Sequence, residues 1–312
     1  TVGNYAQIKV LASDFDGWLL LWGTIGTDEI VIPNWGASIR SIYLHSFTTS
    51  NNLILNVWRN LYRSINRINS GIERINAMNS EQIDEDLKNK YIGEHKFLRA
   101  MLYFSLVTTW ENIPLILEES KSEDIGNFEV SQSSAKEVYN QIIEDLEFAE
   151  SVLDEVQGQG RATKGAAQAL LGKVYLQMTG YPLNETDKYT LAANKLESVI
   201  NSGVYHLVSY YPDLFTVDYE QCEEIVFSIG AAGPGLNQGS NLGTLFGPQG
   251  QTINGGAAGN NWFINLELAG PDSGFGGVDD NFFNGGRNNY DFAQSYTEDD
   301  IRSRNNVAKH NV

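Results

Sequence analysis

The sequence predicts a mostly α-helical protein built from tetratricopeptide-like helix pairs, with an irregular, loop-rich part and little strand. Three observations lead to this prediction. Apolar residues recur every three or four positions between residues 53 and 203, and glycine or proline marks where these stretches end. From residue 204 onward, long runs are rich in glycine and asparagine. We therefore expect a single domain, 1–312, with a helical part at about 53–203 and an irregular part at about 24–52 and 204–312.

Composition excludes several classes of function. The 312 residues include 21 Lys and Arg against 39 Asp and Glu, a formal charge of −18. Such a surface repels nucleic acids and anionic lipids, whereas a neutral ligand such as a glycan meets no such repulsion. The one cysteine, Cys222, excludes an intramolecular disulfide framework and a multi-cysteine metal site. We expect it to be a small, half-buried structural residue.

The two ends predict a trimmed chain. No stretch is long and apolar enough to cross a bilayer, and Thr1 is not followed by the basic and apolar regions of a signal peptide. Residues 301–312 are polar and contain no closing element. We expect a mature or trimmed sequence that ends inside its fold.

The first elements are a short helix and a long one. Residues 1–26 have helical spacing and end at glycines, and residues 27–36 form a loop marked by proline and glycine. A strong helix then keeps the 3.6-residue period through residues 58–75. Asn69 lies on its apolar face. A buried Asn needs partners, so we expect a structural hydrogen bond to a neighbouring loop.

Residues 91–117 contain the most densely apolar helix. Two apolar rows run along it: Phe97, Met101, Phe104 and Val107, and beside them Leu98, Leu102 and Leu106. The helix belongs to a stretch at 81–109 whose charged first part should be solvated, and an extended tail begins near Pro114. His95 has no catalytic constellation around it, so we expect it at the surface or capped.

The next helix follows an acidic linker at residues 118–130. Ser134 and Glu137 have the spacing of a capping box, and an apolar face continues to Leu153. A run of carboxylates such as this one is usually a solvated face. The residues expected mostly on that outer side are Glu144, Asp145, Glu147 and Glu150.

Two further helices complete the helical part. Thr163 is the expected N-cap of one, and small residues along it let a neighbour approach closely, namely Ala166, Ala167, Ala169 and Gly172. After a turn at 180–182 comes a helix at 189–201, closed by Gly203. The stretches 58–110 and 134–203 resemble loose repeats of one design. Because one helix pair cannot bury its own apolar face, the pairs should stack into a curved array.

The irregular part carries fewer signals. Residues 224–229 are the best strand candidate, because they are β-branched and aromatic between glutamate and glycine. Residues 230–289 are rich in glycine and asparagine, and a loop this long is usually functional or disordered. A short helix is expected at 290–297.

Catalytic and cofactor motifs are missing from the sequence. It contains no G-x-S-x-G, H-E-x-x-H, Walker A or C-x-x-C pattern, so we predict no enzyme activity, no cofactor and no metal site. Carboxylates are numerous, so counting alone leaves a glycosidase pair open.

Aromatic residues beside amides stand out in the loops. Trp35 follows Pro33 and Asn34, and Trp262 follows Asn260 and Asn261. Sugar rings stack their apolar faces on aromatic planes, and their hydroxyls bind Asn, Asp and Arg side chains. The alternative, that these tryptophans are core residues of the irregular part, stays open.

Six motifs in order resemble those of SusD/RagB proteins. Residues 93–117, GEHKFLRAMLYFSLVTTWENIPLIL, resemble the family's E-x-x-F-L-R-A helix and V/I-P-L turn. The other five are Thr27-Asp28-Glu29 for S-D-E, Trp58-x3-Tyr62-x2-Ile65-x3-Asn69, residues 162–175 for A-T-x-x-A-A-x-A-L-L-x-x-Y-L, residues 224–227 for E-I-I-F, and Asp300-x-Arg302 for D-x-R. Together they cover nearly the whole chain.

The resemblance implies a surface-exposed lipoprotein of the Bacteroidetes outer membrane with a SusD-like α/α superhelix. Such proteins bind oligosaccharide and deliver it to a SusC-like TonB-dependent transporter; the anchoring N-terminal lipid would lie outside this sequence. Within the family pattern we expect Trp35 and Trp262 to stack on sugar rings, with Asp28, Arg40 and Asn261 binding hydroxyls. Two alternatives stay open: a protein–protein scaffold without a sugar site, and a hydrolase with unrecognised carboxylates.

Overall fold

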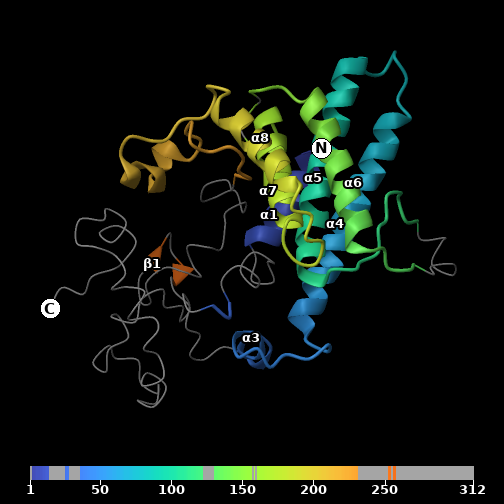
Figure 1. Cartoon of the computed structure of the whole chain (residues 1–312), viewed down its shortest axis with the longest axis vertical. Coiled ribbons are helices and arrows are strands. Elements are labelled where there is room, and N and C mark those ends of the chain that lie inside the picture. Colours follow the sequence, from blue (N-terminus) through green and yellow to red (C-terminus); the bar gives the residue numbers. More distant parts are fainter. Residues whose placement is uncertain are drawn as a thin grey trace. The chain divides into compact units, whose positions relative to one another are not determined.

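The computed structural model confirms a mostly helical protein (Figure 1). The residues it describes are 2–13, 25–27, 36–121, 130–156, 158, 160–230, 252–253 and 256–257. Within these residues the chain forms seven α-helices, two short 3-10 helices and one small ladder of two-residue strands. No helix among the described residues is long and apolar enough to cross a membrane.

The chain divides into two compact units. The first comprises Thr1–Lys9, Trp58–Val208 and Gln221–Gly230, and the second comprises Val10–Val57, Ser209–Glu220 and Ala231–Val312. The α-helices are α1 (Val2–Ser13), α3 (Ala37–Tyr43), α4 (Asn52–Asn76), α5 (Glu85–Trp110), α6 (Ala135–Val152), α7 (Lys164–Met178) and α8 (Lys188–Ile200). The second unit also holds 3-10 helices η2 (Tyr211–Phe215) and η3 (Val217–Tyr219), and the antiparallel strands β1 (Thr252–Ile253) and β2 (Gly256–Ala257).

Side-chain caps start four of these helices; at α4, Asn51 Oδ1 accepts from the Leu53 and Ile54 amides. Ser134 and Glu137 form the predicted capping box at α6: the Glu137 amide donates to Ser134 Oγ, and the Ser134 amide donates to Glu137 Oε2 at 2.7 Å. Thr163 Oγ1 accepts from the Ala166 amide at the start of α7, as predicted. At α5, Asp84 accepts from two backbone amides. That cap explains why α5 begins later than the predicted stretch at 81–109.

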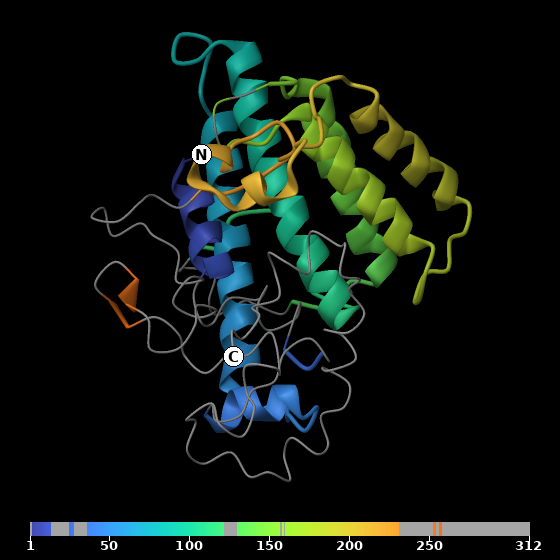
Figure 2. The ribbon, with the colours of Figure 1, turned by 90° about the vertical axis from the view of Figure 1, so that its left-hand side faces the viewer.

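Helices α5 to α8 pack side by side, each antiparallel to the next (Figures 1 and 2). The start of α5 meets the end of α6, where a Cβ on Gly93 would approach Val152 within 2.5 Å. In α7, a Cβ on Gly172 would lie 2.6 Å from Leu196 of α8. The predicted close approach at small residues is therefore present, and a larger residue at Gly172 must displace the Leu196 side chain.

The core is densest along α5, where Leu98, Leu102, Tyr103 and Leu106 are fully buried. His95 is also buried, so the prediction of a surface position is wrong. Its Nδ1 lies 2.6 Å from the carbonyl oxygen of Tyr91, one turn earlier in α5, a contact within the helix and not a cap. Burial lowers the pKa of His95 below its usual value.

Asp145 requires a second correction. It was expected on the solvated face of α6, but it is completely buried. Arg99 of α5 donates to both of its carboxylate oxygens, at 2.7 and 2.8 Å, which compensates for the loss of hydration. The neighbouring Glu144 and Glu147 are exposed, as predicted.

The predicted strand at residues 224–229 is absent from the structure. Its backbone lies in turns and irregular conformations, and the Phe227 ring packs edge-on against Phe97 of α5 at 4.9 Å between centroids. The apolar side chains are thus used to cover a helix instead of a sheet. Cys222 is half-buried, as expected. The predicted loop at 230–289 lies almost entirely outside the described residues. The predicted helix at 290–297 lies entirely outside them.

Candidate functional site

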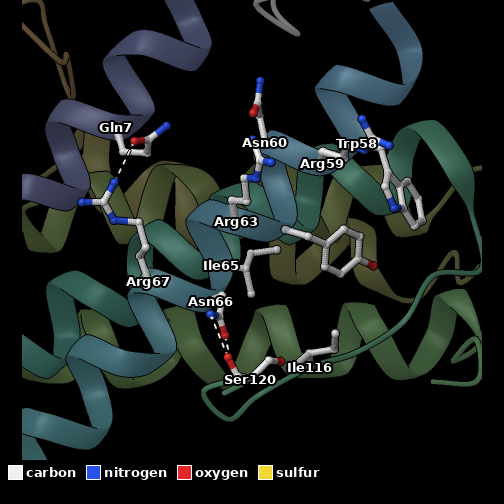
Figure 3. Close-up of a pocket in the computed structure, with 11 residues that line it drawn as sticks. Gln7, Trp58, Arg59, Asn60, Arg63, Ile65, Asn66, Arg67, Ile116 and Ser120 are labelled. Carbon is white, nitrogen blue, oxygen red and sulfur yellow. Dashed lines mark hydrogen bonds between the residues drawn. The ribbon is translucent and has the colours of Figure 1, made fainter. Parts of the chain in front are cut away.

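An open groove of about 710 Å³ runs along one side of α4 (Figure 3). Helix α4 supplies most of its lining, with Gln7 of α1 and two residues of the segment after α5. The lining residues are Gln7, Trp58, Arg59, Asn60, Tyr62, Arg63, Ile65, Asn66, Arg67, Ile116 and Ser120.

One wall of the groove is the extended segment 113–120, which polar side chains of α4 hold in place. Tyr62 donates from its hydroxyl to the Pro114 carbonyl oxygen at 2.8 Å. Asn69 Nδ2 donates to the carbonyl oxygens of Ile116 and Glu118, at 3.0 and 3.1 Å. An extended segment without a partner strand needs such partners for its backbone groups. The predicted structural role of Asn69 is therefore confirmed.

Asn66 binds the same wall in both directions. Its Nδ2 donates to the Ser120 carbonyl oxygen at 3.3 Å, and the Ser120 amide donates to its Oδ1 at 2.6 Å (Figure 3). This pairing fixes the Asn66 side chain against the wall and leaves it one N–H donor and one lone pair for a ligand.

Helix α5 holds the wall from the other side. The Tyr103 hydroxyl donates to the Ile116 carbonyl oxygen at 2.7 Å and accepts from the Ile116 amide at 2.8 Å. Burial raises the pKa of Tyr103 to about 12, so it remains a neutral donor and acceptor. Arg99 donates to Asn69 Oδ1 at 2.9 Å and to the Leu117 carbonyl oxygen at 3.3 Å, while its other nitrogens bind Asp145. Arg99 thus connects α4, α5, α6 and the wall.

No residue of α5 lines this groove. The most apolar helix of the sequence therefore acts by positioning: it supplies Arg99 and Tyr103, which fix the wall against which a ligand would rest.

The chemistry of the lining suits a polar ligand with an apolar face. Trp58 is half-buried, with its ring edge-on to Trp110 at 5.1 Å and tilted to Tyr62 at 4.9 Å between centroids. Beside it lie the Asn60 amide and a row of arginines at every fourth position, Arg59, Arg63 and Arg67. Aromatic planes among amides and guanidinium groups can hold the apolar face and hydroxyls of a sugar.

A metal-dependent site has no support in the described part of the chain. There, no group of three or more His, Cys, Asp or Glu side chains is arranged to hold a metal ion.

Of the site residues predicted from sequence, the structure describes only Arg40. It lies exposed on α3, and its side chain is not among those that line the groove. Trp35, Trp262, Asp28 and Asn261 lie outside the described residues, so their roles remain predictions. Sequence reasoning missed the groove, although the R-x3-R-x3-R spacing at 59–67 was a visible signal on a helix already recognised.

Comparison with known proteins agrees with this fold. Residues 27–176 match a family model described as "Starch-binding associating with outer membrane". A SusD-like protein of Bacteroides ovatus is 30% identical over 161 residues, which are 51% of this chain and 29% of that protein. SusD-like protein P2 of Formosa agariphila is 27% identical over 237 residues, 70% of this chain and 44% of the relative. The chain thus spans less than half the length of these relatives.

Solved structures extend the likeness to three dimensions. A SusD superfamily protein from Parabacteroides distasonis has a TM-score of 0.68 at 26% identity, covering 81% of this chain and 55% of the other. A laminarin-binding SusD-like protein has a TM-score of 0.67 at 25% identity, covering 80% and 56%. The helical array, the motif residues that hold segment 113–120 and these matches agree, and the chain is similar to proteins of the SusD/RagB family over most of its length.

Proposed function

We propose that this chain is a non-enzymatic, cell-surface glycan-binding protein that captures an oligosaccharide and delivers it to a SusC-like TonB-dependent transporter in the outer membrane. The observation that carries the proposal is the groove along α4, where Trp58 lies among amide and guanidinium side chains. The starch-binding description of the family model and the laminarin-binding relative support a sugar as the ligand. In this proposal an N-terminal lipid outside the sequence anchors the protein to the membrane.

The groove offers an aromatic ring for the apolar face of a sugar and an amide for its hydroxyls. The indole of Trp58 offers an apolar plane for the ring CH groups, and Asn60, which also lines the groove, can bind hydroxyls. The wall at 113–120 is already held by hydrogen bonds from α4 and α5. Because the site is formed before binding, little conformational entropy is lost when a ligand enters.

A second ligand surface is proposed on the loops. It would use Trp35 and Trp262 for stacking and Asp28, Arg40 and Asn261 for hydroxyls, as the family pattern implies. The two proposed surfaces consist of different residues, so a substitution in one leaves the residues of the other unchanged.

Calorimetric titration with neutral oligosaccharides from laminarin, starch and xyloglucan, and with sulfated and carboxylated oligosaccharides, tests the proposal. We expect at least one to bind, Asn60→Ala to weaken that binding if the groove holds the sugar, and Trp262→Ala to weaken it if the loops do. Asn60 is only half-buried, so its variant should fold, which circular dichroism checks. Chromatography of the glycans after incubation should show no cleavage products. A panel in which nothing binds, or a glycan that is cut, contradicts the proposal.

Exposed apolar side chains on α8 favour a second candidate, a helical scaffold that binds another protein. Tyr189 and Ile200 are 54% and 73% exposed, and Leu196 lies between them on the same side of the helix. A blank glycan panel together with co-purification of a transporter would favour this candidate over sugar binding. Tyr189→Ser with Ile200→Ser should then reduce the co-purification.

A further inference from the structure

We infer that the ligand of the α4 groove is an anionic glycan, one that carries sulfate ester or carboxylate groups on successive sugars. The inference rests on the proposed function and specifies the ligand class of the same groove. It is carried by the arginine row, Arg59, Arg63 and Arg67, which lies along the groove beside Trp58 and Asn60 (Figure 3).

The row has a regular geometry. Residues four apart lie on the same side of a helix, about 6 Å apart along the axis. The three arginines therefore offer positive charge at three points over about 12 Å. A single anion would need only one of them, whereas an extended chain with a charge on successive sugars can meet all three.

The charge of the row is not neutralised by the protein. Among the described residues, no carboxylate lines the groove, and none of the three arginines has an ion pair with an Asp or Glu. By contrast, Arg99 and Arg161 are each paired with a buried carboxylate. Helix α4 contains only one acidic residue, Glu73, and its Oε1 accepts from the Glu119 amide instead.

A neutral partner orients the Arg67 side chain and does not neutralise its positive charge. Its Nη1 donates to Gln7 Oε1 at 2.9 Å, a neutral acceptor on α1 (Figure 3). No other described residue binds its guanidinium, whose planar shape matches sulfate and carboxylate oxygens in pairs.

The arginine row also destabilises α4 when no ligand is bound. Like charges at four-residue spacing repel each other and destabilise a helix. In a chain with a net charge of −18, three cations gathered on one face form a local exception. An anionic ligand relieves this repulsion, whereas a neutral ligand does not, so the groove discriminates by charge.

Matched glycan pairs test the inference by calorimetric titration of the whole chain. One pair is dextran and dextran sulfate oligosaccharides of equal length, and the other is oligogalacturonate and its methyl ester. A polyglutamate peptide serves as an anion that is not a glycan. The variant is Arg59→Gln with Arg63→Gln, both exposed and without ion pairs among the described residues. The control is Arg74→Gln, exposed on α4 but outside the groove.

We expect one anionic glycan to bind more tightly than its neutral counterpart, with affinity falling as salt rises. The double variant should lose about tenfold or more of that affinity, while Arg74→Gln should retain it. The pair that responds distinguishes sulfate from carboxylate.

Three results overturn the inference. If neutral and anionic glycans bind equally, or the double variant behaves as Arg74→Gln does, charge recognition is wrong and the proposed glycan binding stands. If polyglutamate binds more tightly than both anionic glycans, the row recognises an acidic protein surface. If no glycan of either kind binds, the proposed function fails, and this inference fails with it.

Discussion

Replacing Asp145 with asparagine should strongly destabilise the helical unit, because it leaves a buried guanidinium without its counter-charge. The change keeps the shape of the side chain. Arg99, only 5% exposed, then faces a neutral amide, and so does Lys96, whose Nζ lies 3.2 Å from Asp145 Oδ1. The Lys96 side chain is 17% exposed and can be hydrated in part, but the Arg99 side chain is only 6% exposed, so water can hardly replace the partner that Arg99 loses.

The expected loss follows from the contacts. Asp145 accepts two charge-assisted hydrogen bonds from Arg99, at 2.7 and 2.8 Å, each worth about 1.5–3 kcal/mol. Removing one partner of a buried ion pair typically destabilises a protein by about 3–5 kcal/mol, which agrees with that sum. Since domains are stable by only about 5–15 kcal/mol, Asp145→Asn should remove a large share of the free energy of unfolding.

Urea unfolding followed by far-ultraviolet circular dichroism measures the effect. With a denaturant slope of about 1–3 kcal/mol per M, the midpoint should fall by about 1 M or more. Asp154→Asn is the matched control, because Asp154 binds Lys90 at a similar 2.8 Å but both side chains are well exposed. Solvent and salt screen that pair, so the urea midpoint of Asp154→Asn should hardly differ from that of the unchanged protein. Equal midpoints for the two variants would refute the reasoning from burial.

Three further predictions concern stability. Burial lowers the pKa of His95, so the unfolded chain takes up a proton near pH 6.5 while the folded chain does not. The free energy of unfolding should therefore be at its full value above that pH and fall on acidification, by up to about 1.4 kcal/mol per pH unit. In urea titrations at several pH values, His95→Gln should flatten this slope. Ser134→Ala should lower the free energy of unfolding by about 1 kcal/mol, and Ser134→Gly by less, because glycine is a tolerated N-cap. Gly172→Val should lower the free energy of unfolding by about 1–3 kcal/mol, and with it the melting temperature, through overpacking against Leu196, whereas Gly180→Ala, which meets only ordinary contacts, should not.

Local signals made most of the helical part predictable. The capping box at Ser134 and the N-cap at Thr163 depend on residues within three positions, so the sequence contains the whole interaction. The burial of Asp145 depends on Arg99, which is 46 residues away in the sequence. A carboxylate in an acidic run gives no local sign of such a partner, and the solvated reading was therefore wrong. The same holds for His95, which packs beside Gly71 of another helix.

The candidate site was less predictable, because the groove exists only when α4 and a distant segment meet. Asn66 binds Ser120 across 54 residues, and Tyr62 binds Pro114 across 52. Periodicity could show that Asn69 needs a partner on a loop, but not that this loop forms the wall of a groove. The tryptophans predicted for sugar stacking, Trp35 and Trp262, lie outside the described residues and stay predictions.

The two sides of α4 have separate tasks, and this separates stability from ligand choice. Two polar residues of the family motif, Tyr62 and Asn69, have their polar atoms bound to segment 113–120 or to Arg99, so they have little left for a ligand. The arginines lie at positions outside that motif and have no carboxylate partner among the described residues. A substitution on the motif side should therefore weaken every ligand together by loosening the wall. A substitution in the arginine row should change which glycan binds while the helix and wall remain folded, because those side chains hold no part of segment 113–120.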